Sequence, residues 1–285
     1  MTTTTMIELF IDGIARGLVF ALLGAGITLV FGLGNILNIA IGVFAIIALI
    51  ATVQLLAVSS SVAVAAVGGL AFVAVLGLAV DRTLLSLVYR KDGEERILLG
   101  IFVTLGLMLF FEGVLFVEFP EGFTLSHGIP SLTVAGVSVR GSTQIIILIS
   151  SIVLLLLFLF LHLTYLGKAT RTVFQDETGA LLCGINPRRI QTLIFVVSVV
   201  FAGLAGILQG FETDLRPAAA FELTVFAIIV SIVGGVRNIR GTVVAGLLLG
   251  LVITYANFFI GAFVAKMILF GVAVVVLLLR PEEIA

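Results

Sequence analysis

Long apolar runs separated by short polar stretches make up most of this chain. No charged residue occurs between Gly17 and Val80, a stretch much longer than the about 20 apolar residues that cross a bilayer as one helix. Runs such as 145–161 are apolar on nearly every face, whereas the strands of a membrane barrel alternate between apolar and polar positions. The pattern predicts an all-α fold, that of a polytopic helical membrane protein.

Nine candidate membrane spans follow from this pattern. They cover residues 7–31, 39–57, 61–81, 97–118, 144–166, 190–211, 219–235, 241–257 and 261–279. The polar divisions at GLGNILN, SSS and NFFIG are short, so an eight-span arrangement is an alternative. We expect a single membrane domain over residues 1–285, placed in the cell membrane as a multi-pass protein.

Charged residues are few and sit at the ends of the spans. Lysine and arginine favour the cytoplasmic loops of membrane proteins. Four regions hold eleven of the fifteen basic residues, namely Arg82, Arg90, Lys91, Arg96, Lys168, Arg171, Arg188, Arg189, Arg237, Arg240 and Arg280. We therefore expect these regions inside, and the loops with Arg140 and Arg216 outside. We interpret Asp81, Arg82 and Glu222 as residues at span ends.

The residue inventory argues against several kinds of chemistry. The net charge of −1 argues against nucleic acid binding, and the single Cys183 allows no internal disulfide. His127 and His162 have no second ligand at helical spacing, and Gly167-Lys168-Ala169-Thr170 lacks the glycine and hydroxyl pattern of a phosphate loop. We therefore expect no enzyme, no metal site and no cofactor bound by this chain. MTTTTMIELFID has no basic start, so we expect no cleaved signal peptide.

A polar segment, residues 167–190, separates two very apolar runs. Asp176 is a suitable N-cap, Glu177 complements the helix dipole in a first turn, and Gly184 is a natural C-terminal stop. Asn186-Pro187 then places a cap residue before a proline at the first position of the next span. The segment predicts a short helix near residues 177–183 that lies outside the membrane.

Two roles are open to this short helix. The helix offers an apolar patch of Ala180, Leu181 and Leu182. The small residues Thr178 and Gly179 allow another surface to approach closely. The helix can lie on lipid headgroups, or it can fit a groove on a partner protein. Its small apolar area favours the partner protein.

The run LGKATRTVFQDETGALLCGINPRRIQTLIFVVSVVFAGLAGILQG resembles the signature region of permease subunits of ABC importers of the branched-chain amino acid type, the LivH group. FALLGAGITLVFGLGNILNIAIG is similar to the first span of that family, IFVTLGLMLF to its fourth, and AIIVSIVGGVRNIRGTVVAGLLLG to its penultimate region. LLLRPEEI resembles the family's ending. The resemblance covers nearly the whole chain and keeps the family's order.

The resemblance implies that the short helix is a coupling helix, which sits in a cleft of an ATPase subunit. The implied docking residues are Glu177, Thr178, Gly179, Ala180, Leu181 and Gly184. Importer permeases generally carry a Glu-Ala-Ala motif followed by a glycine. Here only Ala180 and Gly184 match this frame, and Glu177 stands one place early.

Three polar residues within the apolar runs are candidates for the translocation path. Asn35 and Asn38 either face a cavity or cap a broken helix, because leaving them to lipid is costly. Glu112 either marks the path or lies near the outer interface beside Glu118. The family commonly has a histidine where this chain has Ile41, so any role of that histidine is absent here.

The resemblance also implies an assembly. It predicts a second permease of the LivH or LivM type, two ATPase subunits that bind ATP, an extracytoplasmic solute-binding protein and a lipid bilayer as partners. The implied substrates are leucine, isoleucine or valine. Urea or short-chain amides are an alternative substrate class. An ion-coupled secondary transporter is an alternative mechanism, which would require intramembrane acids or broken helices as its ion site.

Overall fold

The computed structural model describes residues 3–34, 36–59, 61–91, 93–126, 128–134 and 136–279. Its long helices are α1 (Thr3–Gly34), α3 (Val62–Val80), α5 (Gly93–Glu118), α6 (Gly141–Leu163), α9 (Pro187–Gly210) and α11 (Ile239–Ile260). The shorter apolar helices are α2 (Ile41–Leu56), α10 (Ala219–Gly234) and α12 (Ala262–Leu279). A π-helical turn, η1 (Asp81–Leu85), and α4 (Ser86–Val88) continue α3, while α7 (Tyr165–Gln175) and α8 (Glu177–Leu182) lie between α6 and α9.

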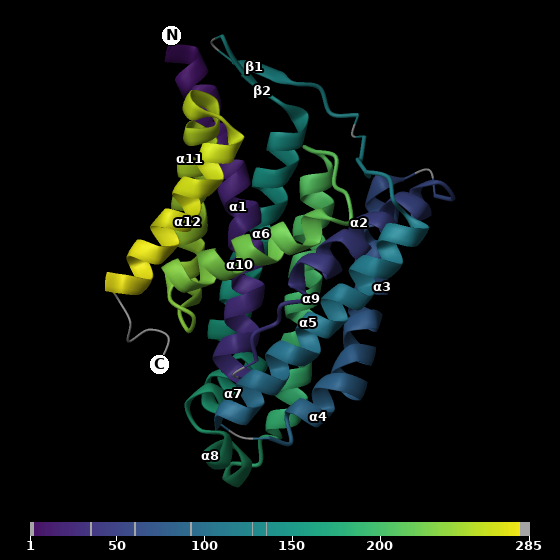
Figure 1. Cartoon of the computed structure of the whole chain (residues 1–285), viewed down its shortest axis with the longest axis vertical. Coiled ribbons are helices and arrows are strands. Elements are labelled where there is room, and N and C mark those ends of the chain that lie inside the picture. The colour runs from purple at the N-terminus through teal and green to yellow at the C-terminus, as the bar shows by residue number, and fades with distance from the viewer. Residues whose placement is uncertain are drawn as a thin grey trace.

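Helix α1 runs through the length of the bundle and packs against α6, α9, α10 and α11 (Figure 1). The two short helices α2 and α10 lie within the bundle, and α10 crosses its long axis in this view. Residues 41–50 of α2 are all buried. Other helices surround this part of α2, which explains why its sequence shows no polar face. The result is a helical membrane protein with broken helices inside the bundle.

Glycines allow the closest helix contacts. A Cβ atom added to Gly42 at the start of α2 would lie 1.9 Å from the carbonyl oxygen of Ala220 in α10, and one on Gly250 of α11 would lie 2.2 Å from the Cα of Gly17 in α1. Small residues at such crossings let helix backbones approach in a lipid environment, where van der Waals packing drives association.

The break between α1 and α2 is held by hydroxyl groups of other helices. Thr104 of α5 donates to the carbonyl oxygen of Leu37 (3.0 Å), and Thr224 of α10 donates to that of Ile39 (2.9 Å). Thr224 also accepts from the amide of Gly42 (3.0 Å). These bonds satisfy backbone groups that the helix break leaves unpaired, as irregular backbone inside a membrane domain requires.

The helices agree with most of the predicted spans. Within the described residues, six helices are long and apolar enough to cross a membrane, and three apolar helices, 41–56, 219–234 and 262–276, are shorter. The chain breaks its helices at all three uncertain divisions: after Gly34, at residues 57–61, and at Gly261 with a φ of +99°. The sequence analysis did not predict α7, nor the antiparallel hairpin of β1 (Leu132–Val134) and β2 (Val137–Val139).

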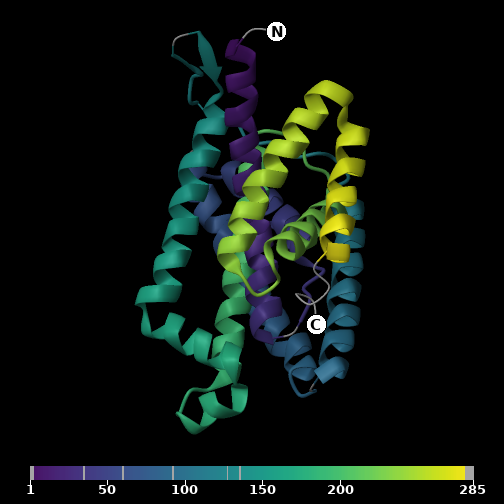
Figure 2. The same cartoon turned by 90° about the vertical axis from the view of Figure 1, so that its left-hand side faces the viewer.

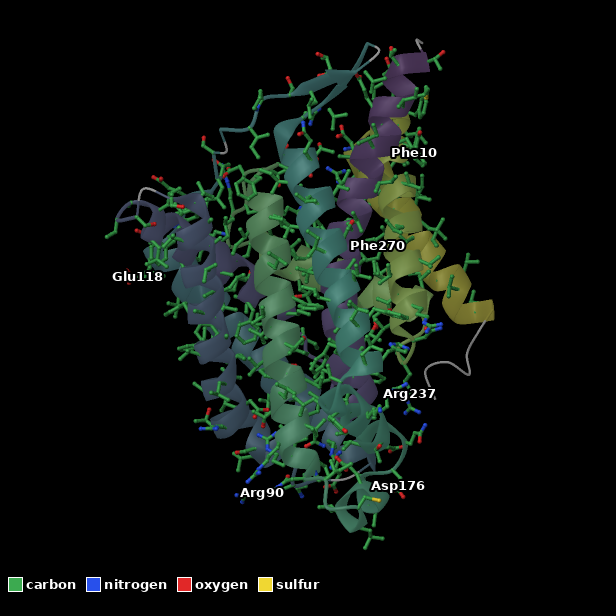
Figure 3. All side chains as sticks on the ribbon, turned by 180° about the vertical axis from the view of Figure 1, so that it is seen from behind. Phe10, Arg90, Glu118, Asp176, Arg237 and Phe270 are labelled. Atoms are coloured by element: carbon green, nitrogen blue, oxygen red, sulfur yellow. The ribbon has the colours of Figure 1, made fainter. Side chains whose placement is uncertain are left out.

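Basic residues gather at one end of the bundle. Figure 3 shows Arg90, Asp176 and Arg237 at this end, and Phe10 and Glu118 towards the other. Contacts join the basic loops there, since one cleft is lined by Arg82, Arg188 and Arg189 and another by Arg171, Arg237 and Arg240. By the positive-inside rule we expect this end, hereafter the basic end, to face the cytoplasm.

Candidate functional site

The polar segment forms an elbow, residues 164–186, that projects from the basic end. Figure 2 shows α7 leaving the lower end of α6 sideways, followed by α8 at the lowest point of the molecule. Thr164 starts α7 by accepting from the amide of Gly167 (3.0 Å). The turn is tight, because a Cβ on Gly167 would lie 2.2 Å from the carbonyl oxygen of Phe160. Helix α7 has one apolar face, which turns inward at Thr170 and Val173.

Helix α8 begins and ends as the sequence predicts. The Asp176 carboxylate accepts from the amide of Thr178 (2.9 Å). At the other end Gly184 has a φ of +76°, and the amides of Gly184 and Ile185 donate to the carbonyls of Leu181 and Ala180. This pair of bonds is a Schellman motif, which needs a left-handed residue at the position of Gly184.

Asn186 then caps α9 by accepting from the amide of Arg189 (3.3 Å), with Pro187 at the first helical position. The short helix and its neighbouring span start are confirmed.

The exposed face of α8 differs in one residue from the expected patch. Leu181 and Leu182 are 59% and 86% exposed, and Cys183 is exposed beside them. Ala180, which we expected in this patch, is fully buried, because α8 packs against α7 and α9 on that side. Thr178 is exposed, and Gly179 is partly buried against the Asp176 carboxylate. The available apolar surface therefore consists of the two leucines.

Glu177 ties α8 to two helices of the bundle. Its carboxylate pairs with the guanidinium of Arg96, in the first turn of α5, at 3.3 Å. It also accepts a hydrogen bond from the side-chain amide of Gln191 in α9. The Arg96 side chain is only 9% exposed, and its Nε donates to the carbonyl oxygen of Lys91 (2.7 Å). The sequence gives no signal for this contact, since Arg96 and Glu177 are far apart in the chain.

A second ion pair lies next to the first. Asp81, at the junction of α3 and η1, is fully buried, and both of its carboxylate oxygens accept from Arg188 of α9, at 3.1 and 2.7 Å. Thr192 donates to the same carboxylate (2.7 Å). Asp81 does lie at a span end, as interpreted, but its partner is Arg188 rather than its neighbour Arg82.

Tyr89 lies between the two pairs. Arg188 stacks over its ring at 4.4 Å and Arg96 at 5.9 Å. Burial raises the pKa of Tyr89 well above its usual range, and the Asp81 carboxylate adds to the shift. The phenol is therefore neutral at physiological pH. Together the two ion pairs and this ring join α8 to the basic ends of α3, α5 and α9.

Two of the predicted path residues, Asn38 and Glu112, lie outside the elbow, at the break between α1 and α2 and on α5. Asn38 is fully buried, and its Oδ1 accepts from the amide of Ala40 (3.2 Å). Its Nδ2 has no hydrogen-bond partner among the described residues, so Asn38 braces the helix break and leaves one donor unused. Asn35 lies outside the described residues. Glu112 is partly buried on α5, without a hydrogen bond or ion pair in the described ranges. Ile41, in place of the family's histidine, is fully buried.

A polar cavity that the sequence analysis missed lies away from the basic end, where α1, α9, α10, α11 and α12 meet. It has a volume of about 170 Å³. Glu222 of α10 and Lys266 of α12 form an ion pair at 2.8 Å on its wall. The polar lining also includes Arg16, Gln209 and Asn257, and its apolar lining consists of Phe20, Phe226, Ile253, Ala262 and Ala265. Charges of both signs thus face one small, partly apolar space.

A bundle of apolar helices with an elbow tied into three of them has the architecture of a helical membrane protein with a projecting segment at its basic end. The chain belongs to the family described as branched-chain amino acid transport system / permease component, which matches residues 9–278. It is accordingly a multi-pass permease subunit of an ABC transporter in the cell membrane, a transport component and not an enzyme.

Curated relatives agree with this membership. The high-affinity branched-chain amino acid transport system permease protein LivH of Salmonella typhimurium is 25% identical over 290 residues, covering 96% of this chain and 93% of the relative. LivH of Escherichia coli is 26% identical with the same coverage, and BraD of Pseudomonas aeruginosa is 24% identical over 98% of this chain and 95% of its own. No solved structure matches the chain.

Proposed function

We propose that this chain is one half of the translocation path of an ABC importer for branched-chain amino acids, and that α8 couples it to a separate ATPase subunit. The observation that carries the coupling is the position of Glu177. It lies on the projecting helix, yet its carboxylate is bonded to Arg96 of α5 and Gln191 of α9. A push on α8 is therefore passed to two membrane helices through charged and polar contacts.

The mechanism follows from this linkage. The ATPase subunits bind ATP, and this chain binds no cofactor of its own. Their closure moves α8, because Leu181 and Leu182 sit in a groove of the ATPase. The contacts of Glu177 and Asp81 then move the basic ends of α3, α5 and α9 together, which switches the bundle between inward and outward opening.

The polar cavity supports an amino acid as substrate. A leucine zwitterion carries one carboxylate, one ammonium group and an apolar side chain. The Arg16 side chain makes no hydrogen bond or ion pair within the described part of the chain, and the Glu212 carboxylate acts on it only electrostatically, so its guanidinium can still take a substrate carboxylate as a direct partner. Glu222 can accept from an ammonium group, and Phe20, Phe226 and Ile253 offer apolar contact. Urea, which has neither charge, would use little of this lining.

The family supports further partners. We propose a second permease of the same family to complete the path, two ATPase subunits, and an extracytoplasmic solute-binding protein that delivers the substrate. Transport without any ATPase partner would favour the secondary-transporter alternative instead.

The docking step is tested by replacing both exposed leucines, Leu181→Asp and Leu182→Asp, and measuring co-purification of the ATPase. We expect the complex to be lost while the purified permease melts at an unchanged temperature. Leu87→Asp is the matched control, because Leu87 is also an exposed leucine at the basic end, on α4. Unchanged association in the double variant would refute the docking surface.

The substrate assignment is tested by Arg16→Gln in vesicles that contain the complete transporter. A lost charge-assisted hydrogen bond costs about 1.5–3 kcal/mol, so leucine uptake at low concentration should fall about tenfold or more. Arg216→Gln removes the same charge from an exposed loop residue outside the cavity and should leave uptake unchanged. Equal uptake in both variants would remove the cavity from the path.

A further inference from the structure

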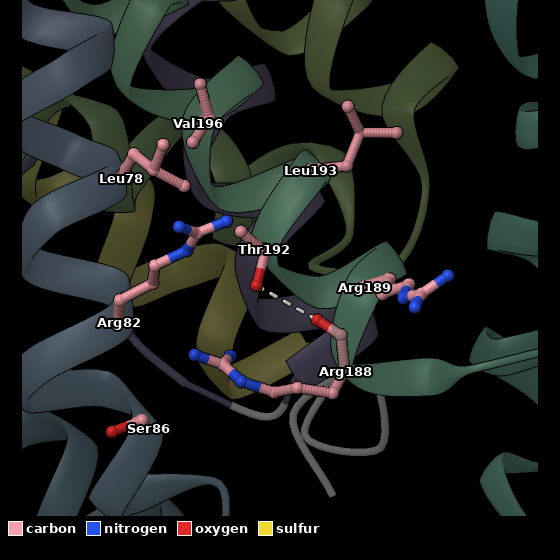
Figure 4. Close-up of a pocket in the computed structure, with 8 residues that line it drawn as sticks. All are labelled: Leu78, Arg82, Ser86, Arg188, Arg189, Thr192, Leu193 and Val196. Carbon is pink, nitrogen blue, oxygen red and sulfur yellow. Dashed lines mark hydrogen bonds between the residues drawn. The ribbon is translucent and has the colours of Figure 1, made fainter.

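A second cleft opens at the basic end, between α3 with η1 and α4 on one side and the start of α9 on the other (Figure 4). Its volume is about 630 Å³. Its lining consists of Leu78, Arg82, Ser86, Arg188, Arg189, Thr192, Leu193 and Val196. The cleft is separate from the exposed leucines of α8 and from the polar cavity, but it shares Arg188 and Thr192 with the Asp81 contacts that the proposed coupling uses.

The cleft carries positive charge without compensation. Arg188 is neutralised by Asp81. The side chains of Arg82 and Arg189, by contrast, have no hydrogen bond or ion pair to any described residue. Figure 4 shows the guanidinium groups of Arg82 and Arg188 in the space between α3 and α9, with Arg189 on the other side of α9. An anion bound between α3 and α9 would therefore meet the unbalanced charge of Arg82 and the guanidinium of Arg188, while Arg189 adds its unbalanced charge from the other side of α9.

An apolar track leads from these arginines towards the middle of the bundle. On α3, Val75 and Leu78 precede Arg82 at helical spacing, and Val75 is 68% exposed. On α9, Val196 lies opposite Leu78 above Thr192, and Leu193 also belongs to the lining. The polar opening lies at the cytoplasmic end of two membrane helices, and the apolar part lies within the depth of the membrane.

We propose that this cleft binds an anionic phospholipid of the cytoplasmic leaflet. The phosphate lies between Arg82 and Arg188, and an acyl chain follows Leu78, Leu193 and Val196. Charge selects the headgroup, since basic pockets between membrane helices attract anionic lipids at the cytoplasmic face. The apolar track selects a lipid over a free phosphate ion. The bound lipid touches Arg188 and Thr192, both of which hold Asp81.

The absence of tryptophan from the chain allows a direct test. Leu78→Trp in the full-length permease introduces the sole tryptophan, inside the cleft. In phosphatidylcholine vesicles, a small fraction of bromine-labelled phosphatidylglycerol should quench its fluorescence more strongly than the same fraction of bromine-labelled phosphatidylcholine. We expect a preference of about tenfold or more in relative affinity. Phe102→Trp, at an exposed residue of α5, should show no preference.

Adding Arg82→Gln and Arg189→Gln to the Leu78→Trp variant should abolish the preference, whereas Arg90→Gln with Lys91→Gln removes two charges outside the cleft lining and should keep it. The proposal is overturned if both brominated lipids quench equally, or if the preference survives the Arg82 and Arg189 changes. It is also overturned if inorganic phosphate displaces the brominated lipid at equal concentration, because the cleft would then be a site for a free anion. If the Arg82 and Arg189 changes abolish ATPase association and leave the lipid preference intact, the two arginines belong to a protein interface and not to a lipid site.

Discussion

The guanidinium Nη2 of Arg188 lies 2.7 Å from Oδ2 of Asp81, and the two partners differ sharply in exposure: 34% of the arginine side chain is exposed and none of the aspartate. Removing either residue therefore leaves a different charged group without its partner. After Arg188→Met, a carboxylate stays fully buried with Thr192 as its remaining side-chain donor. After Asp81→Asn, the arginine can turn its guanidinium towards water.

We expect the two substitutions to differ in cost. Arg188→Met should destabilise the permease by about 3–5 kcal/mol, because an unpaired charge remains buried. Asp81→Asn should cost about 1–2 kcal/mol, since only the net value of the hydrogen bonds is lost. Thermal unfolding of the purified permease in detergent measures both. Equal destabilisation would contradict this account of the pair.

Glu177 offers a test of coupling apart from docking. Glu177→Ala removes the contacts to Arg96 and Gln191 but leaves Leu181 and Leu182 exposed for the ATPase. We expect the complex to assemble and hydrolyse ATP while uptake per ATP falls about tenfold, the effect of losing roughly 1.4 kcal/mol of linkage. Glu95→Ala, which removes an exposed carboxylate paired with Lys91, is the control. Unchanged uptake per ATP would show that α8 acts through other contacts.

The crossing of α2 and α10 depends on Gly42. In Gly42→Ala the new methyl group meets the carbonyl oxygen of Ala220 at 1.9 Å, so the helices must separate, at a cost of about 1–3 kcal/mol. The matched change Gly106→Ala on α5 meets nothing within 4 Å and should stabilise the helix by up to about 1 kcal/mol. Thermal unfolding compares them. A neutral Gly42→Ala would mean that this crossing is looser than described.

Glu212, in the loop after α9, predicts that the stability of the permease depends on pH. Burial raises the pKa of Glu212 above its ordinary value of 4.5, the guanidinium of Arg16 opposes the shift, and the Asp12 carboxylate adds to it. The folded state thus holds the proton more tightly than the unfolded state. Protonated Glu212 makes its full contribution to the stability of the folded state below pH 4.5. This contribution is lost as the pH rises through the pKa that Glu212 has in the folded state. We expect Glu212→Gln to flatten that decline in unfolding measurements across pH, and an unchanged slope would contradict it.

Local signals predicted much of the structure and little of the site. The ends of α8 and the start of α9 were predicted from Asp176, Gly184, Asn186 and Pro187, because capping depends on neighbouring residues alone. The breaks after Gly34 and at Gly261 followed from interrupted apolar runs.

The contacts of Glu177 with Arg96, of Asp81 with Arg188 and of Glu222 with Lys266 join residues far apart in the chain. Only the packing of the helices brings them together. The inward turn of Ala180 was missed for the same reason, since a helix as short as α8 has too few residues to reveal its buried face.

The central claim, that α8 lies in the cytoplasm and docks an ATPase, is tested most directly at Cys183. This residue is the single thiol of the chain and is exposed beside Leu182. A membrane-impermeant maleimide should label it in inside-out vesicles and not in right-side-out vesicles, and the bound ATPase should block the labelling. Labelling from the outside would reverse the orientation, and cytoplasmic labelling that the ATPase leaves unchanged would contradict docking at α8.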